Sequence, residues 1–410
     1  MKGRRVVQVK RRIVVVGGGV GGISVARGLV RDGHDVTVFE QRPEIRAGGG
    51  AVTIWCNGAT VLEQLGVDMD GAGQILSTLR VVTATGHPIT TVDIAAIADR
   101  LGAPVRMVPR RVLLERLMDG FPGDRIRCHS RVARMVTTPH GVRVEFDDGR
   151  STEADLLIGA DGLHSTVRGI VGAPPARPTG WCSWQGLVTL PGAVADNRVA
   201  LMMIGEHGNL GLWPAGDSDL QWWFDLPWSR DFVRPQRPIE LIRSHFTGWS
   251  DEVDRVLAAL TDDDLTGSPY PHFRHPIPRR VRGPLTLLGD AAHTMPPTLA
   301  QGTNQALLDT MVLCRTLSES GRGRSGGNGH PALRRYEKIR RRRVAAVSRV
   351  ASLQVSHGES ALRPAALISD RMMTRALTLF VGSTSHRGIS ADVDADARLS
   401  RPTAPAALGE

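Results

Sequence analysis

The apolar positions near the start of the chain change from a continuous run to a helical spacing and back again. Residues 13–16 form a short apolar run, which predicts a buried strand. The next apolar side chains share one face of a predicted helix that ends at Gly33, and these are Ile23, Ala26, Leu29 and Val30. Apolar residues at 36, 38 and 39 predict a second strand. The pattern therefore predicts a strand–helix–strand unit.

Further along the chain, short apolar or alternating runs predict more strands. They lie at residues 51–55, 75–92, 126–128, 131–136, 142–146, 155–160, 183–190, 220–226 and 285–289. Helices are predicted where Asn57 and Ser165 can act as caps, and after Pro109 and Pro297. A glycine-rich linker at 321–329 precedes a long basic helix and an amphipathic segment at 362–381, and we expect residues 384–410 to be frayed.

The composition of the predicted strands changes near residue 175. Seven of the eight tryptophans fall between residues 181 and 249, on short alternating segments that predict a sheet with one aromatic face. Such a face can pack the core of its own sheet, or it can line a binding pocket. The sequence pattern leaves both interpretations open.

The first predicted unit carries a glycine motif between its strand and its helix. Gly17, Gly19 and Gly22 have the G-x-G-x-x-G spacing, and Glu40 follows at the end of the second strand. Glycines there allow a tight turn and a close approach of backbone N–H groups to a pyrophosphate. The acid is placed to accept a hydrogen bond from a ribose hydroxyl. The unit predicts a dinucleotide site, without distinguishing NAD from FAD.

Composition excludes several other classes of protein. The 410 residues are 41% hydrophobic and 22% charged, as in globular proteins, and no apolar run is long enough to cross a membrane. The start of the chain lacks a signal-peptide core, and the four cysteines form no C-x-x-C pair, so we expect a cytoplasmic protein with reduced cysteines and no metal site. These cysteines are Cys56, Cys128, Cys182 and Cys314.

The net charge of +10 comes almost wholly from arginine, since all but three of the 51 basic residues are arginine. No nucleic-acid-binding motif accompanies this charge, so we expect no nucleic-acid partner. The run 340–343 lies in the predicted basic helix and is interpreted as a solvated face. The excess of arginine, with abundant alanine and glycine, is explained more easily by a GC-rich coding bias than by function.

Two downstream motifs indicate a family. GADGLHSTVR at 159–168 ends a predicted strand in Asp161, and LLGDAAHTMPP at 287–297 places Asp290 before a helix, with QGTN at 301–304. Together with GGGVGG and Glu40, in this order and at these separations, the chain resembles the class A flavoprotein monooxygenases, the para-hydroxybenzoate hydroxylase family. The resemblance covers residues 10 to 350 and is closest to the subgroup of urate hydroxylases and related hydroxylases or epoxidases.

The resemblance implies an α/β fold in which a Rossmann-like parallel-sheet domain binds FAD and a mixed sheet binds substrate. The expected FAD-binding domain comprises 10–75, 100–178 and 276–320, the substrate domain 76–99 and 179–275, the C-terminal helices 330–383 and the flexible tail 384–410. It implies that Asp161 is structural, with a role near the pyridine nucleotide. The residues that it implies around FAD are Gly17, Gly19, Gly21, Gly22, Glu40, Gln41, Thr53, Arg110, Val132, Asp290, Pro297, Ala300, Gly302, Thr303 and Asn304.

The resemblance also implies the chemistry. Such enzymes take electrons from NADH or NADPH, form a flavin C4a-hydroperoxide with O2, and pass one oxygen to an aromatic or olefinic small molecule. A reductase or dehydrogenase on the same scaffold, and a non-catalytic binding protein, remain alternatives. Ala300 favours the last of these, because relatives mostly have glycine there. The GC-biased composition fits a bacterial enzyme of secondary metabolism. A monomer and a homodimer are both open.

The expected substrate residues lie on the aromatic strands. WCSWQGLVTL, GLWPAG and WWFDLPW carry the likeness to the urate subgroup, but Asn209 stands where those enzymes have arginine and Gln221 where they have tyrosine. We therefore expect a larger, apolar substrate rather than urate, held by Trp184, Met202, Asn209, Trp213, Gln221 and Trp223. Of these, Trp184 and Trp213 are expected to face the pocket. No catalytic acid or base is identified, although His207, His272 and His275 are candidates because histidine titrates near neutral pH.

Overall fold

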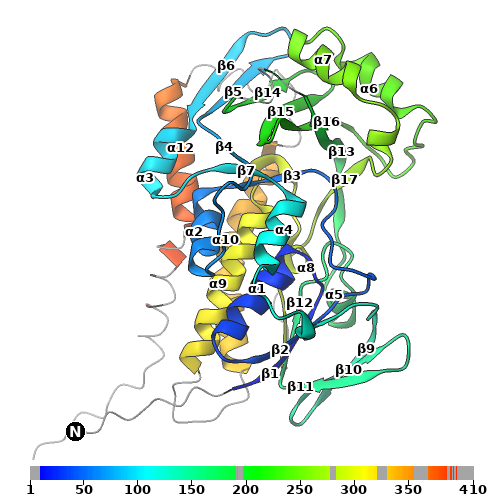
Figure 1. Cartoon of the computed structure of the whole chain (residues 1–410), viewed down its shortest axis with the longest axis vertical. Helices are drawn as coiled ribbons and strands as arrows, with labels where there is room; N and C mark the ends of the chain where they lie inside the picture. Colours follow the sequence, from blue (N-terminus) through cyan, green and yellow to red (C-terminus); the bar gives the residue numbers. More distant parts are fainter. Residues whose placement is uncertain are drawn as a thin grey trace, which may run out of the picture.

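The computed structural model describes residues 10–190, 192, 197–277, 283–320, 330–354, 368–385, 388–389, 391 and 394. Two large sheets organise the chain, a parallel sheet in the lower half of Figure 1 and a mixed sheet in the upper half, joined by the long helices between them. No helix of the described residues is long and apolar enough to cross a membrane. The predicted linker at 321–329 lies outside the described residues.

The parallel sheet has the strand order β18-β12-β1-β2-β8. Its central strand β1 pairs in parallel with β12 on one side and β2 on the other. Such strands are buried on both faces, which explains the continuous apolar run at residues 13–16. The strands are β1 (Arg12–Val16), β2 (Asp35–Phe39), β8 (Ile126–Arg127), β12 (Leu156–Gly159) and β18 (Leu285–Leu287).

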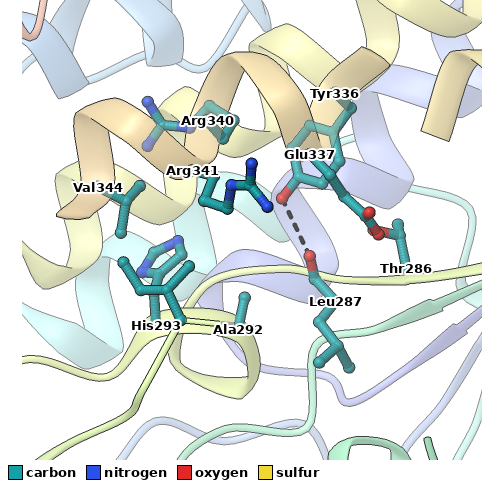
Figure 2. Close-up of a pocket in the computed structure, with 10 residues that line it drawn as sticks. Thr286, Leu287, Ala292, His293, Tyr336, Glu337, Arg340, Arg341 and Val344 are labelled. Atoms are coloured by element: carbon teal, nitrogen blue, oxygen red, sulfur yellow. Dashed lines mark hydrogen bonds between the residues drawn. The ribbon is translucent and has the colours of Figure 1, made fainter. Parts of the chain in front are cut away.

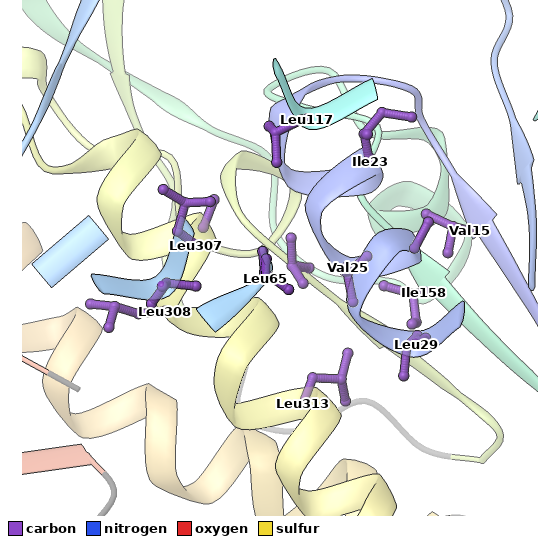
Figure 3. Packing of buried hydrophobic residues seen from close by; sticks show 14 of the residues in the cluster. Val15, Ile23, Val25, Leu29, Leu65, Leu117, Ile158, Leu307, Leu308 and Leu313 are labelled. Carbon is purple, nitrogen blue, oxygen red and sulfur yellow. The ribbon is translucent and has the colours of Figure 1, made fainter. Parts of the chain in front are cut away.

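Helices cover one face of this sheet. Figure 3 shows Ile23 and Leu29 of α1 packed between Val15 and Ile158 of the sheet and the leucines of α9, in the largest apolar core of the chain. The helices around this core are α1 (Val20–Arg31), α2 (Cys56–Gln64), α4 (Arg110–Met118), α9 (Gly302–Ser320) and α10 (His330–Gln354).

A three-stranded antiparallel sheet and two short helices cover the opposite face. Val142 and Val144 of this small sheet pack against Val14 and Leu157 in a separate core. The elements are β9 (Val132–Thr138), β10 (Gly141–Phe146), β11 (Ser151–Ala154), α5 (Thr166–Ile170) and α8 (Asp290–His293). Ser165 caps α5 by accepting a hydrogen bond from the Arg168 N–H, as predicted.

The mixed sheet has seven strands in the order β17-β13-β16-β15-β14-β5-β6. The helices α6 (Pro238–Phe246) and α7 (Asp251–Ala259) pack on the face that points away from the parallel sheet (Figure 1). The strands are β5 (Thr78–Thr83), β6 (Pro88–Asp93), β13 (Arg177–Thr189), β14 (Val199–Ile204), β15 (Asn209–Gly216), β16 (Asp219–Pro227) and β17 (Tyr270–Arg274).

A small sheet and two helices connect the two halves. In the small sheet, β7 lies between β3 and β4, and α12 packs against α3 and β6. These elements are β3 (Ala51–Ile54), β4 (Gln74–Ile75), β7 (Arg106–Pro109), α3 (Ile94–Leu101) and α12 (Asp370–Ser383). Three short 3-10 turns complete the described elements, η1 (Gly123–Arg125), η2 (Asp263–Leu265) and η3 (Pro297–Leu299).

Several local predictions are wrong. Asn57 does not cap α2, since Trp55 is the cap residue and the Asn57 amide donates to Gln301 and Thr384 instead. The α-helix after Pro297 begins only at Gly302, because the 3-10 turn η3 intervenes. The segment after residue 383 is packed where it is described, as Ile389 is fully buried in the main core.

Candidate active site

The glycine loop of β1 and α1 has the backbone geometry that the motif predicts. Gly17 has a φ of +106°, and a Cβ there would lie 2.4 Å from the Ala160 carbonyl oxygen. A Cβ on Gly22 would lie 1.8 Å from the Gly17 carbonyl oxygen. By contrast, a Cβ on Gly19, the cap of α1, would meet no described atom within 4 Å. The loop is therefore closed beneath and open at the helix N-terminus, where a pyrophosphate fits.

Glu40 holds the side of this loop. Its carboxylate accepts hydrogen bonds from the Gly18 N–H at 2.7 Å and from the Arg42 N–H at 2.9 Å. Each oxygen retains a further lone pair, so the carboxylate can also accept from a ribose hydroxyl. Gln41 is exposed beside it, and Val132 begins β9 as a buried residue.

Asp290 lies at the carboxyl end of β18, where ligands of open parallel sheets bind. Its side chain is exposed, yet the surrounding protein raises its pKa by desolvation, which His293 and Arg110 partly oppose. An accessible carboxylate that is nevertheless surrounded by protein lies in a cleft. Arg168 fixes this turn from behind, as its guanidinium donates to the Ala291 and Ala292 carbonyls at 3.0 Å.

Arg110 lies across from Asp290. Desolvation lowers the pKa of Arg110, while the charge of Asp290 raises it, so the two side chains are electrostatic neighbours. Among the described residues, the buried Arg110 Nε has no hydrogen-bond partner. A buried guanidinium N–H without an acceptor is costly, and the phosphate or carbonyl oxygens of FAD are suitable acceptors.

The segment between η3 and α9 forms another part of the wall of the candidate FAD site. Ala300 adopts the left-handed conformation with a φ of +49°. A Cβ on Gly302, the first residue of α9, would meet no atom of the described chain within 4 Å, and Thr303 is half-buried beside it. The first turn of α9 contains no acidic residue, so its N–H groups are available to a carbonyl-rich ligand edge.

Two residues expected at FAD have side chains committed to the protein. The Asn304 amide accepts from the Trp55 N–H and donates to the Thr53 and Ala300 carbonyls, each at 2.9 Å. Its amide therefore ties α9 to β3. The Thr53 hydroxyl is buried and donates to the sulfur of Met107. Asp161 caps α5 by accepting from Ser165 and the Val167 N–H, in agreement with a structural role.

The two faces of the seven-stranded sheet differ sharply in burial. On β16, Trp222 and Phe224 point to α6 and α7 and are 0% exposed, while Trp223 and Asp225, which alternate with them, are half-buried on the face toward the parallel sheet. The side of the sheet on which Trp223 and Asp225 remain partly accessible, which we call the open face, is the candidate substrate surface.

Trp184 is not on the open face, so the prediction that it faces the pocket is wrong. It pairs across the sheet with Phe224 and packs with Phe232 beside α6. The five other expected substrate residues are on the open face by the strand register. These are Met202, Asn209, Trp213, Gln221 and Trp223.

The side chains on the open face are not equally available. Gln221 accepts a hydrogen bond from the Ala51 N–H and donates to the Trp222 carbonyl, so it links the sheet to the loop before β3. Trp213 and Trp223 pack on each other with their ring centroids 5.5 Å apart. Within the described chain, Trp213 Nε1 and Asn209 Oδ1 have no hydrogen-bond partner although both atoms are buried. These two polar atoms can be satisfied by a ligand.

The three candidate histidines lie in different environments. His207 is exposed in the β14–β15 turn, and its role as a base stays a prediction. His275 is buried against the Asp290 carbonyl at 3.0 Å, and desolvation lowers its pKa to about 4. His272 lies on the open face 2.6 Å from the Ser183 hydroxyl, which also donates to Asp225 at 2.5 Å.

Sequence reasoning missed Ser183 and Asp225, although a signal was available. On β13 and β16 they alternate with buried apolar residues, as polar residues that face a ligand do. Sequence reasoning also missed Asp309, which is fully buried and accepts from His293 and Arg340, each at 2.6 Å. Although burial raises it, interactions with His293 and Arg340 lower the pKa of Asp309 to about 2.

Arg340 is therefore not part of a solvated face. The Asp309 carboxylate also accepts from the Gly289 N–H at 2.9 Å, which fixes the turn that carries Asp290. Behind this turn lies a cavity of about 50 Å³, shown in Figure 2 with His293 and Tyr336 in its wall and the Tyr336 hydroxyl bonded to the Leu287 carbonyl. This volume suits one or two waters rather than an organic ligand.

Within the described ranges no group of histidine, cysteine or acidic residues could hold a metal ion. All four cysteines are free, as predicted, and burial raises the pKa of Cys56 to about 11 and of Cys182 to about 12.

Comparison with known proteins places this geometry in a family. A family model described as FAD binding domain matches residues 10–351. The FAD-dependent urate hydroxylase of Klebsiella oxytoca is 34% identical over 339 residues, which cover 81% of this chain and 86% of that protein. A 3-amino-4-hydroxybenzoate 2-monooxygenase of Streptomyces platensis is 32% identical over 364 residues, which cover 82% of this chain and 86% of that protein.

A solved structure agrees with these sequences. The crystal structure of Klebsiella pneumoniae HpxO complexed with FAD and uric acid matches with a TM-score of 0.82 at 27% identity, over 93% of this chain and 99% of that one. The resemblance found from the motifs is confirmed. The chain belongs to the FAD binding domain family, as a class A flavoprotein monooxygenase.

Proposed function

We propose that the protein uses FAD and NADH or NADPH to insert one oxygen atom of O2 into a largely apolar aromatic molecule. The observation that carries the proposal is the open face of the seven-stranded sheet, which brings Met202, Trp213 and Trp223 together with few charges. Aromatic walls bury planar ligands efficiently. The absence of an arginine at Asn209 disfavours a small anion as substrate.

The residues present fit FAD. The open N-terminus of α1 suits the pyrophosphate, and the accessible Asp290 carboxylate suits the ribityl hydroxyls. The N–H groups at the start of α9 suit the carbonyl edge of the isoalloxazine. The residues that would hold the cofactor are Gly17, Gly19, Gly21, Gly22, Glu40, Gln41, Arg110, Val132, Asp290, Pro297, Ala300, Gly302 and Thr303, with Thr53, Asp161 and Asn304 shaping the site.

When bound and reduced by NADH or NADPH, FAD supplies the electrons and the centre at which O2 reacts. The protein then has three tasks. The positive end of α9 would stabilise negative charge on a cofactor ring bound there. The buried Trp213 and Gln221 side chains on the open face would limit the access of water to a substrate there. Trp213 and Trp223 orient a planar ring toward the cofactor wall.

The test is the stoichiometry of oxygen transfer. FAD-loaded protein is incubated with NADH or NADPH, 18O2 and each of a panel of probes, namely urate, 3-amino-4-hydroxybenzoate and 1-naphthol. We expect slow oxidation of the nicotinamide alone, faster oxidation with the preferred probe, and one 18O atom in the product for each nicotinamide oxidised. Product formation without O2 would instead support a reductase, and nicotinamide oxidation that yields only peroxide would contradict oxygen transfer.

A further inference from the structure

A buried polar cluster lies on the open face, formed by Ser183, Asp225 and His272 from three adjacent strands. The Ser183 hydroxyl is 2.5 Å from Asp225 Oδ1 and 2.6 Å from His272 Nε2, and His272 Nε2 is 3.9 Å from the same Asp225 oxygen. Ser183 and His272 are each at least 95% buried. None of the three side chains takes part in the FAD site described above.

The hydrogen bonds of the cluster have a definite direction when Asp225 is ionised. The carboxylate can only accept, so the single Ser183 hydroxyl proton is donated to Asp225. His272 Nε2 must then carry a proton and donate it to the Ser183 oxygen. Desolvation lowers the pKa of His272 to about 4, so the ring is neutral at pH 7 and its Nδ1 is an acceptor. Ser183 and His272 therefore orient Asp225 without neutralising it.

The second carboxylate oxygen of Asp225 is left for a ligand. Among the described residues, no group donates a hydrogen bond to Asp225 Oδ2. Nor is Oδ2 one of the fully buried polar atoms that lack a partner, so it is not fully buried. The Asp225 side chain is 13% exposed, whereas its strand neighbours Phe224 and Leu226 point into the opposite, sealed core. A ligand on the open face can therefore reach Asp225 Oδ2.

The described neighbours of Asp225 include no formal positive charge that would hold it. Asn209 lies directly opposite on β15, Ser183 opposite on β13, and His272 beyond it on β17, while Cys182 is the nearest titratable group toward the other face. Burial raises the pKa of Asp225 to about 7, although the Ser183 hydrogen bond lowers it. An acid of this strength can exchange a proton with a ligand near neutral pH.

Building on the proposed function, we propose that Asp225 Oδ2 accepts the proton of an O–H or ring N–H group on the aromatic substrate, with Ser183 and His272 as positioning residues. The substrate class is then phenols and N–H heteroaromatics with an apolar ring system. In the step, the substrate O–H bond breaks, its proton moves to Oδ2, and the electron pair stays on the substrate oxygen. Delocalisation of that pair makes the ring carbons more nucleophilic toward an electrophilic oxygen.

Binding of two matched probes to the FAD-loaded protein tests this assignment. 1-Naphthol has the O–H group and 1-methoxynaphthalene replaces it with a methyl ether. Both are titrated against the flavin absorbance at a series of pH values that includes pH 6 and pH 8. The variants are Asp225→Asn, which keeps the shape but accepts a proton poorly, and Ser183→Ala. Glu206→Gln, on the exposed turn between β14 and β15, is the control.

For the wild-type protein and the control we expect 1-naphthol to bind about tenfold more tightly than the ether at pH 8, with a smaller preference at pH 6, where Asp225 is mostly protonated. Asp225→Asn should reduce the preference to about threefold or less at both pH values. Ser183→Ala should keep the preference but shift its pH midpoint upward, because the hydrogen bond that stabilises the carboxylate is lost.

The assignment would be overturned if 1-naphthol failed to bind, if both probes bound equally, or if Asp225→Asn kept the preference with normal FAD content. If Asp225→Asn did not fold, an unshifted pH midpoint in Ser183→Ala would overturn it. Because the readout is binding, a naphthol preference without oxygen transfer would remove the proposed function and leave this assignment standing. Oxygen transfer in which Asp225 plays no role would remove this assignment and leave the proposed function standing.

Discussion

The two faces of the seven-stranded sheet are made by the same strands but serve different purposes. Toward α6 and α7 the side chains of Trp184, Trp222 and Phe224 are fully buried in one apolar cluster. Toward the parallel sheet Trp223 and Asp225 are half-buried, among other side chains that are buried and partly polar. Successive residues of one strand thus point to opposite faces, one residue into the apolar core and the next toward the candidate substrate surface.

Glycine supports the aromatic rings on both faces. Gly186 lies opposite Trp222, and a Cβ on it would lie 2.8 Å from the indole ring. Gly211 lies opposite Trp223, where a Cβ would lie 1.9 Å from the ring. Each large ring therefore covers a cross-strand glycine. The faces differ in what lies beyond the ring, which is packed protein for Trp222 and the candidate ligand space for Trp223.

The adjacent tryptophans give the largest test of this comparison. Trp222→Ala should lower the free energy of unfolding by about 3 to 5 kcal/mol, because it opens a cavity in a sealed core. Trp223→Ala should lower it by about 1 to 2 kcal/mol, since the ring is already partly accessible, but it should weaken 1-naphthol binding. Urea unfolding of both variants measures the difference. Equal losses would show that the two faces are packed alike.

Ionisation of the buried Asp225 carboxyl should lower the free energy of unfolding at neutral pH. Its folded-state pKa of about 7 lies above the ordinary aspartate value of 3.8, so the folded protein binds more protons. Its contribution is therefore most favourable below pH 4 and is lost as the pH rises to 7. Asp225→Asn should be more stable than wild type by about 3 kcal/mol at pH 8 and close to it at pH 4.

Urea unfolding at both pH values, with Asp219→Asn at the start of the same strand as the control, measures this effect. A stability difference between Asp225→Asn and wild type that is the same at pH 4 and pH 8 would show that the Asp225 carboxyl does not titrate in this range.

Substitutions in the wall of the candidate FAD site should change the affinity for FAD more than the stability of the fold. Asp290→Ala removes an accessible carboxylate and should weaken FAD binding by about 1.5 to 3 kcal/mol, the usual range for hydrogen bonds to a charged group. Fluorescence titration of the apoprotein with FAD measures this loss, and Glu206→Ala on the far turn is the control. Undiminished FAD affinity in Asp290→Ala would remove Asp290 from the proposed FAD site.

Local sequence patterns predicted the parts of the fold that depend on local constraints. The spacing of Gly17, Gly19 and Gly22 follows from backbone contacts within a few residues and with one neighbouring strand, so the motif implied the geometry. The same holds for the Ser165 cap of α5. The first buried strand was predicted because strands buried on both faces have a continuous apolar sequence, whereas the parallel sheet itself was implied by the family resemblance.

Features that depend on distant partners were not predictable in this way. The Arg340 side chain is in a run of four arginines, and only α9, which carries Asp309, distinguishes it from its exposed neighbour Arg341. Trp184 was assigned to the wrong face because its register against Phe224 is set by pairing across β13 and β16. The same pairing brought Ser183 to Asp225 and His272.

The smallest predicted effect concerns Ala300 in the wall opposite the open face. Its φ of +49° is a left-handed conformation, in which a Cβ costs about 1 kcal/mol and glycine costs little. Ala300→Gly should therefore raise the free energy of unfolding by up to about 1 kcal/mol, less the extra chain entropy that glycine gives the unfolded state. Ala292→Gly, at the short helix α8 with no positive φ, should be destabilising by a similar amount.

If Ala300→Gly also tightens FAD binding in the fluorescence titration, the methyl group crowds the cofactor as well as straining the backbone. An unchanged affinity would confine its effect to the backbone, and a loss of stability would contradict the strain itself.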